Sequence, residues 1–116
     1  MLFRSVAVYD HRRHPWLALA PEIESDHLWA SLLPLYEAGE YAAAADRGTG
    51  LVAANPTYAD LAYNVACCES LVGRAADAIE HLRLAIDGSE QFRAMAAGDS
   101  DFDPIRDEPA FKELVS

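Results

Sequence analysis

The chain has 116 residues, of which 52% are hydrophobic, so it has the length of one domain and enough apolar side chains for a folded core. Its formal net charge is −10 at pH 7, and Lys112 is its single lysine. Nucleic acids and anionic membranes are bound by concentrated Lys and Arg, so this composition argues against both as partners. A basic partner or simple solubility fits the negative charge better. No apolar run is long enough to span a membrane, and residues 1–20 lack the continuous apolar core of a signal peptide, so we expect a cytoplasmic protein.

The first 24 residues differ from the rest of the chain and predict a short extended segment. The run from Leu2 to Tyr9 is rich in β-branched and aromatic residues, which favour a strand, and Pro15 follows soon after it. A single strand has no partner within the chain. Three roles remain open: it covers the helices that follow, it pairs with a second copy of the chain, or it belongs to an upstream domain of a longer protein.

The first helix is expected over residues 26–38. Ser25 is suited to cap its N-terminus, and apolar residues recur at intervals of three and four along it. Pro34 lies inside this segment and removes one backbone hydrogen bond. We therefore expect the helix to bend or break at Pro34.

A turn at Gly39 leads into a second helix, expected over residues 41–54 and ended by Pro56. Gly48 and Gly50 lie inside this helix. Each glycine costs about 1 kcal/mol relative to alanine at such a position. Their presence indicates that another segment packs closely against the backbone there.

The rest of the chain predicts further helices joined by short turns, with Gly73 at one of them. Their expected ranges are 58–71, 75–86 and 90–97, followed by two short turns over 101–106 and 108–115, the second capped by Asp107. The C-terminal part is also strongly acidic, and we expect its carboxylates to form a solvated end. These residues are Asp99, Asp101, Asp103, Asp107, Glu108 and Glu113.

Two stretches of the chain echo each other at an offset of 34 residues. Gly39 corresponds to Gly73 at this offset, and Ala44 corresponds to Ala78. Asp26 and Ala42 also find their counterparts, at Asp60 and Ala76. Small and turn-forming residues that recur at this period are typical of stacked helical hairpins, which bury their apolar faces against each other and leave one long surface for binding.

Residues 25–88 resemble two tetratricopeptide repeats. The matching residues of the first are Leu28, Leu35, Tyr36, Gly39, Tyr41, Ala44 and Pro56, and those of the second are Ala62, Val65, Ala66, Gly73, Ala78, Leu82 and Ala85. The stretch from Tyr63 to Cys67 is particularly similar to the start of a bacterial repeat, and the tail from Asp101 to Phe111 looks like the segment that caps the last repeat. Leu32 and Gly48 depart from the pattern, which has a small residue at the first position and a large one at the second.

This resemblance implies an all-α fold in which two helical hairpins form a right-handed stack. It divides the chain into an extended segment over 1–24 and a helical domain over 25–116. Within that domain the repeats span about 25–56 and 57–88, and a C-terminal cap spans 89–116.

The resemblance also implies that the first helix of each hairpin lines a concave groove. The candidate binding residues carried over to this chain are Trp29, Leu33, Tyr36, Tyr63, Asn64 and Cys67. Trp and Tyr offer large contact areas, and the Asn64 amide has both a donor and an acceptor for a peptide backbone. The alternative is that Trp29, Leu33 and Tyr63 are buried under residues 1–24 or under the C-terminal helix. The groove positions that hold a carboxylate in chaperone-type repeats are not basic here, so an acidic peptide C-terminus is not expected to bind.

The chain offers little to catalysis or to metal binding. Cys67 and Cys68 are neighbours and point about 100° apart on a helix, so we expect two buried thiols and no zinc site. His81 is expected to form a solvated surface pair with the adjacent Glu80. A metal site at Asp10, His11 and His14 is disfavoured by the arginines between the histidines. We therefore predict no catalytic residues, no metal and no cofactor.

These features predict a non-enzymatic protein–protein interaction module. It binds a protein or peptide partner, or it associates with itself as a homodimer. The alternative is a C-terminal regulatory or stabilising module of an enzyme. The arrangement also looks like the C-terminal part of bacterial proteins in which a cupin barrel precedes such repeats, with the run from Leu2 to Tyr9 as the last strand of the barrel.

Overall fold

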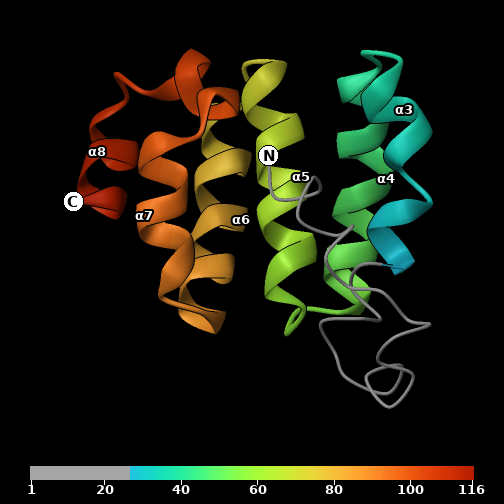
Figure 1. Ribbon diagram of the computed structural model, residues 1–116, viewed down its shortest axis with the longest axis horizontal. Coiled ribbons are helices and arrows are strands. Elements are labelled where there is room, and N and C mark those ends of the chain that lie inside the picture. Colours follow the sequence, from blue (N-terminus) through green and yellow to red (C-terminus); the bar gives the residue numbers. More distant parts are fainter. Residues whose placement is uncertain (1–26) are drawn as a thin grey trace.

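The computed structural model of the protein describes residues 27–116, and this part of the chain is helical throughout, without a strand (Figure 1). The helices are α3 (Leu33–Glu37), α4 (Tyr41–Ala54), α5 (Ala59–Leu71), α6 (Ala75–Gly88), α7 (Gln91–Gly98), the 3-10 helix η2 (Ser100–Ile105) and α8 (Pro109–Val115). The predicted all-α fold is confirmed. The predicted strand, the cap at Ser25 and the disfavoured metal site lie outside the described residues.

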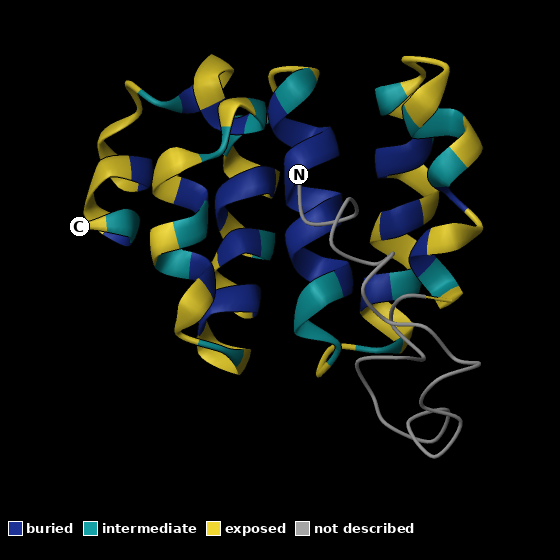
Figure 2. Ribbon diagram, in the orientation of Figure 1, coloured by how far each residue is buried: buried dark blue, intermediate teal, exposed yellow. Residues whose placement is uncertain are grey.

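The helices pack in chain order, and α5 lies at the centre. Each α-helix from α3 to α8 contacts the next α-helix along the chain, and the 3-10 helix η2 contacts α5. Every residue from Leu61 to Ser70 is buried, whereas α4 and α6 alternate between buried and exposed positions (Figure 2). This pattern is consistent with the composition of α5, whose buried residues are mostly apolar but include Asn64, Glu69 and Ser70. None of the described helices is both long and apolar enough to cross a membrane.

Pro34 interrupts the first helical segment, as predicted. Residues 27–30 are helical, a turn follows at 31–32, and α3 begins at Leu33 with Pro34 in its first turn. A proline is tolerated at that position because the first backbone N–H groups of a helix have no partner within it. The expected single helix over 26–38 is therefore two short pieces.

The two turn glycines adopt the same conformation, 34 residues apart. Gly39 has φ 77° and Gly73 has φ 79°, a left-handed region that favours glycine. At the first turn, Gly39 N–H bonds to Tyr36 at 3.0 Å and the following N–H reaches back to Leu35. The second turn repeats both bonds, since Gly73 N–H bonds to Ser70 at 2.9 Å. This is the Schellman arrangement, so the echo in the sequence corresponds to a repeated helix ending.

Gly48 lies where α4 approaches α5 most closely. A Cβ atom at this position would lie 2.5 Å from Cγ2 of Val65 and 3.4 Å from Cδ1 of Leu32. The predicted close approach is confirmed for Gly48 and wrong for Gly50, where no atom lies within 4 Å. The side chains of Val65 and Leu32 thus pack against the space that Gly48 leaves open.

We expect Gly48→Ala to lower the free energy of unfolding by about 1–3 kcal/mol, because the new methyl group overlaps a buried, β-branched side chain with few rotamers. Gly50→Ala in the same helix is the matched control. It meets no atom and is expected to raise the free energy of unfolding by up to about 1 kcal/mol through helix propensity. Urea unfolding followed by circular dichroism measures both changes. Equal effects of the two substitutions would contradict the close packing at Gly48.

The C-terminal segments are held together by Arg106. Its guanidinium donates to the carbonyl oxygens of Ala97 and Asp99, both at 2.7 Å, and lies over the ring of Phe111 at 5.6 Å. The expected cap at Asp107 is wrong, because α8 begins one residue later, with Glu108 as its N-cap and Pro109 in its first turn. Pro109 fixes the start of α8 at this residue, since its φ is preset for the helix.

Candidate functional site

The six candidate binding residues differ in how far they reach solvent. Trp29 and Tyr63 have no exposed surface, and Leu33 and Tyr36 are half-buried. The Tyr63 ring stacks on Phe92 with centroids 4.9 Å apart and meets Phe102 edge-on. Of the three residues for which the sequence left burial open, Trp29 and Tyr63 are buried and Leu33 is not. These two rings are part of the hydrophobic core. The polar groups around them define the candidate site.

Three elements bring polar side chains together in one cluster. The Tyr63 hydroxyl of α5 donates to Oδ2 of Asp99 at 2.8 Å, and the Tyr36 hydroxyl of α3 donates to Oδ2 of Asp101 at 3.1 Å. Cys67 lies one turn after Tyr63, and its Sγ is 3.9 Å from the same Asp99 oxygen. We call these five residues the carboxylate cluster.

The backbone presents the two carboxylates of the cluster on one side of η2. Asp99 is the N-cap of η2, and its Oδ1 accepts the N–H of Asp101 at 3.0 Å. Both residues are half-buried, in contrast to the solvated end expected from the sequence. That expectation is wrong for Asp99 and Asp101 because the fold places the start of η2 against α5. Asp103, Asp107, Glu108 and Glu113 are exposed, as expected.

The phenols and thiols of this region remain protonated at neutral pH. Burial raises the pKa of the Tyr63 and Tyr36 hydroxyls above the ordinary range for tyrosine, and the nearby aspartates raise it further. Burial also raises the pKa of Cys67, and it raises that of Cys68 to about 12. Both thiols are free and buried, as predicted. They are therefore hydrogen-bonding or apolar groups, not nucleophilic thiolates.

Asn64 follows Tyr63 directly in α5 and has an unsatisfied amide. Its side chain is buried, with 1% of its surface exposed, and neither Oδ1 nor Nδ2 has a hydrogen-bond partner. Asn64 precedes Cys67 by three positions, so the two side chains share a face of α5. The buried hydroxyl of Ser70, three positions further, also has no partner. We call the side of the domain on which the carboxylate cluster and Asn64 lie the α3–α5–η2 face, although Tyr63, Asn64 and Cys67 are themselves buried there.

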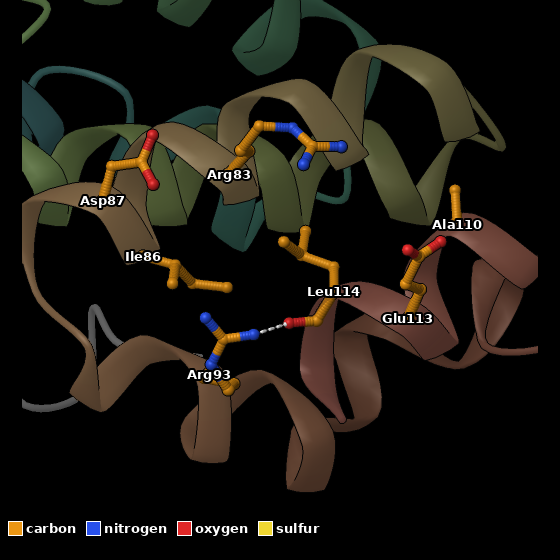
Figure 3. A pocket seen from close by; sticks show the side chains of 7 residues that line it. All are labelled: Arg83, Ile86, Asp87, Arg93, Ala110, Glu113 and Leu114. Atoms are coloured by element: carbon orange, nitrogen blue, oxygen red, sulfur yellow. Dashed lines mark hydrogen bonds between the residues drawn. The ribbon is translucent and has the colours of Figure 1, made fainter.

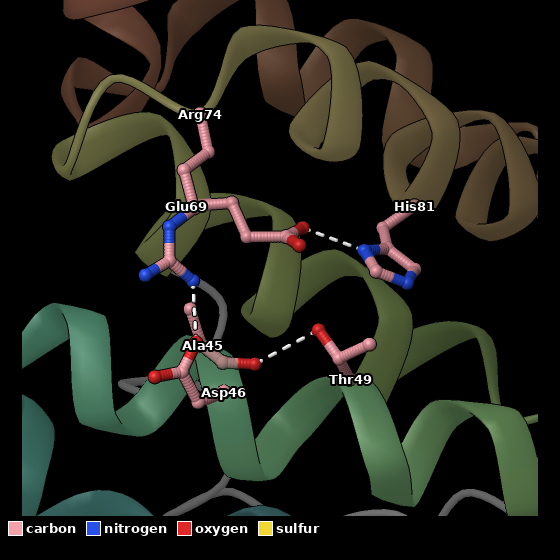
Figure 4. A network of polar contacts seen from close by, with 6 residues as sticks. All are labelled: Ala45, Asp46, Thr49, Glu69, Arg74 and His81. Carbon is pink, nitrogen blue, oxygen red and sulfur yellow. Dashed lines mark hydrogen bonds and ion pairs between the residues drawn. The ribbon is translucent and has the colours of Figure 1, made fainter.

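A second polar contact lies on the other side of α5. Oε1 of Glu69 is 2.6 Å from Nδ1 of His81 on α6 (Figure 4). The Glu69 side chain is 2% exposed and that of His81 is 14% exposed. The expected surface pair between His81 and Glu80 is therefore wrong, because His81 turns towards α5 and meets a buried carboxylate. An exposed ion pair between Arg74 and Asp46, at 2.6 Å, lies nearby (Figure 4).

A pocket of about 400 Å³ opens between α6, α7 and α8 (Figure 3). Its lining side chains are Arg83, Ile86, Asp87, Arg93, Ala110, Glu113 and Leu114. Arg93 donates to the backbone carbonyl of Leu114 and pairs with Glu90, so it links α7 to α8. The pocket is lined by charged side chains of both signs. The guanidinium of Arg93 is already engaged in the contacts that link α7 to α8. It therefore indicates no particular ligand.

The carboxylate cluster is the part of the described chain best suited to hold a cation. One ligand atom from each of Cys67, Asp99 and Asp101 can be chosen so that all three lie within 4.8 Å of one another. Sequence reasoning assigned Tyr36, Tyr63, Asn64 and Cys67 to the expected groove but missed both aspartates. One signal for Asp99 was available in the sequence. Gly98 predicts the end of a helix, so Asp99, which follows directly, is a candidate N-cap of the next one. Comparisons with protein-family models, curated proteins and solved structures found no match for this chain.

Proposed function

We propose that this chain is a non-enzymatic interaction module of the tetratricopeptide type, which holds a peptide segment of a partner protein on the α3–α5–η2 face. The 34-residue echo and the two identical glycine turns support the repeat assignment. The succession of antiparallel helices in Figure 1 is consistent with it.

The unsatisfied amide of Asn64 is the observation that carries this proposal. Leaving a buried donor or acceptor without a partner costs about 1–3 kcal/mol, and native proteins rarely tolerate it without a reason. A peptide backbone offers one N–H donor and one C=O acceptor per residue, which is what an amide side chain needs. Asn64 therefore favours an extended peptide as the ligand.

Binding is tested by selecting ligands from a random dodecapeptide library with the purified full chain. The selected peptides are resynthesised with blocked termini, and their affinities are measured by fluorescence anisotropy for the wild type and for Asn64→Leu. We expect Asn64→Leu to weaken binding by about tenfold or more, since two hydrogen bonds to the peptide are lost. Trp29 and Tyr63 are buried in the core. Alanine substitutions at these two positions would therefore disturb folding and are unsuitable as binding probes.

Leu84→Ala serves as the matched control, because Leu84 is an exposed apolar residue on α6, away from the proposed face. It is expected to bind the selected peptides as the wild type does. Enrichment of no peptide at all would contradict the proposed function. Equal binding by Asn64→Leu and the wild type would contradict the placement of the ligand beside Asn64.

A further inference from the structure

The contact between Glu69 and His81 joins two helices through an ionisable group. Oε1 of Glu69 on α5 lies 2.6 Å from Nδ1 of His81 on α6, and the Glu69 side chain is buried (Figure 4). A buried carboxylate is costly unless a hydrogen-bonded positive charge compensates it. His81 supplies a positive charge when its ring is protonated, so this compensation depends on pH.

The acidic groups around His81 favour its protonated form. Glu69 contacts the ring from α5, and two carboxylates of the histidine's own helix, Asp77 and Glu80, also act on it. The hydrogen bond to Glu69 raises the pKa of His81 above its ordinary value, although burial of the ring acts in the opposite direction. The folded protein therefore holds this proton more tightly than the unfolded chain does.

The basic groups near this contact are engaged elsewhere. Arg74, the N-cap of α6, acts on Glu69, but its guanidinium pairs with Asp46 of α4 at 2.6 Å in an exposed position. The other helices packed on α6 present Arg93 from α7 and Glu113 from α8 to the pocket of Figure 3, towards the end of α6. Neither arginine replaces the imidazolium as the direct contact of the buried carboxylate, since solvent screens an exposed cation.

The position of the contact in the stack determines which helices respond to it. α4 and α6 pack on opposite sides of α5, whereas α7 and α8 pack on α6 (Figure 1). In a stack of helices each element is stabilised mainly by its neighbours, so a weaker interface loosens the elements beyond it. A change at the α5–α6 interface is therefore expected to affect α6 more than α4.

We propose that protonated His81 acts as a latch that holds α6 on α5, and that this helical hairpin loosens as the pH rises from acidic to alkaline values. The apolar contacts between the two helices remain at alkaline pH, so the protein stays folded while α6 opens more often. Glu69 lies on the other side of α5 from the α3–α5–η2 face. The latch is thus a further property of the fold and does not rest on the proposed function.

Hydrogen exchange of the full chain, followed by NMR at about pH 6 and about pH 9, tests the latch on both sides of the ordinary histidine pKa of about 6.5. The reporters are buried residues, Leu82 and Ala85 in α6 and Ala45 and Val52 in α4. After correction for intrinsic exchange, we expect protection in α6 to fall by about tenfold relative to α4 at the higher pH. This is the order expected when one hydrogen bond to a charged group is lost.

Glu69→Gln and Glu80→Gln form a matched pair of variants. Each removes one carboxylate near His81, but Glu69 is buried against the ring, whereas Glu80 is exposed and lies 3.7 Å from Arg83. Glu69→Gln is expected to abolish the selective fall of protection in α6, and Glu80→Gln is expected to keep most of it. His81→Gln should also abolish it, because its amide can donate to Glu69 and does not titrate.

Two results of the exchange experiment would overturn the latch. One is an equal fall of protection in α4 and α6 of the wild type, because pH would then act on the whole fold. The other is a selective fall in Glu69→Gln as large as in the wild type. If Glu69→Gln and His81→Gln do not fold, the pKa of His81 measured by NMR in the wild type decides. We expect a value above about 6.5, and a value at or below it would contradict the latch.

Discussion

Replacing Tyr63 by alanine is expected to lower the free energy of unfolding by about 3–5 kcal/mol, which is the usual cost of removing a buried aromatic ring. Tyr63 has no exposed surface, and its ring stacks on Phe92 of α7 and meets Phe102 of η2. The substitution therefore opens a cavity between the central helix and the C-terminal segments. Urea unfolding followed by circular dichroism measures the change.

Tyr63→Phe is the control that separates the ring from its hydroxyl. It keeps both aromatic contacts and removes only the hydrogen bond to Asp99, so we expect a loss of about 1 kcal/mol. A similar loss for Tyr63→Phe and Tyr63→Ala would mean that the hydroxyl, and not the packing of the ring, joins α5 to η2. A negligible loss for Tyr63→Ala would contradict the burial of this ring.

Replacing His81 by leucine is expected to lower the free energy of unfolding by about 3 kcal/mol, because it leaves the Glu69 carboxylate buried without its partner. Replacing both residues, as in Glu69→Met with His81→Leu, is expected to recover much of this loss, since two apolar groups need no hydrogen bond. Arg74→Leu is the comparison, because it breaks an exposed ion pair with Asp46 and should change stability little. Equal effects of His81→Leu and Arg74→Leu would contradict the buried pair.

The same pair makes stability depend on pH. The hydrogen bond that protonated His81 donates to Glu69 raises the pKa of His81 above its ordinary value, and the nearby carboxylates add to this effect. A raised pKa in the folded state means that the folded protein holds the proton more tightly than the unfolded chain does. The stabilisation is therefore complete below the ordinary pKa of histidine, about 6.5, and is lost as the pH rises through the raised pKa. Urea midpoints measured between acidic and alkaline pH should fall for the wild type more steeply than for the variant with Glu69→Met and His81→Leu.

Local features of the fold could be predicted from the sequence because they depend on neighbouring residues. The boundaries of α4, the break at Pro34 and the turns at Gly39 and Gly73 follow from backbone preferences that act within a few positions. The close packing against the backbone at Gly48 could also be predicted, because a glycine inside a helix lowers stability unless another segment needs the space.

The contacts that define the candidate site could not be predicted in the same way. Tyr36 and Asp101 are 65 residues apart, and Tyr63 and Asp99 are 36 residues apart, so their hydrogen bonds depend on how the helices stack. An acidic run in a sequence usually indicates a solvated surface. Gly98 marks Asp99 as a candidate cap, but the local pattern does not show that Asp99 and Asp101 lie against α5. The choice of Glu69 over Glu80 as the partner of His81 likewise depends on the packing of α6 on α5.

The central claim is that Asn64 serves to bind a partner and not to stabilise the fold. The free energy of unfolding of Asn64→Leu, measured by urea denaturation, tests this claim most directly. We predict a value equal to that of the wild type or up to about 2 kcal/mol higher, because an apolar side chain of the same branching removes the cost of a buried, unsatisfied amide. A loss of more than about 2 kcal/mol in both Asn64→Leu and Asn64→Ala would contradict the claim and identify Asn64 as a structural residue.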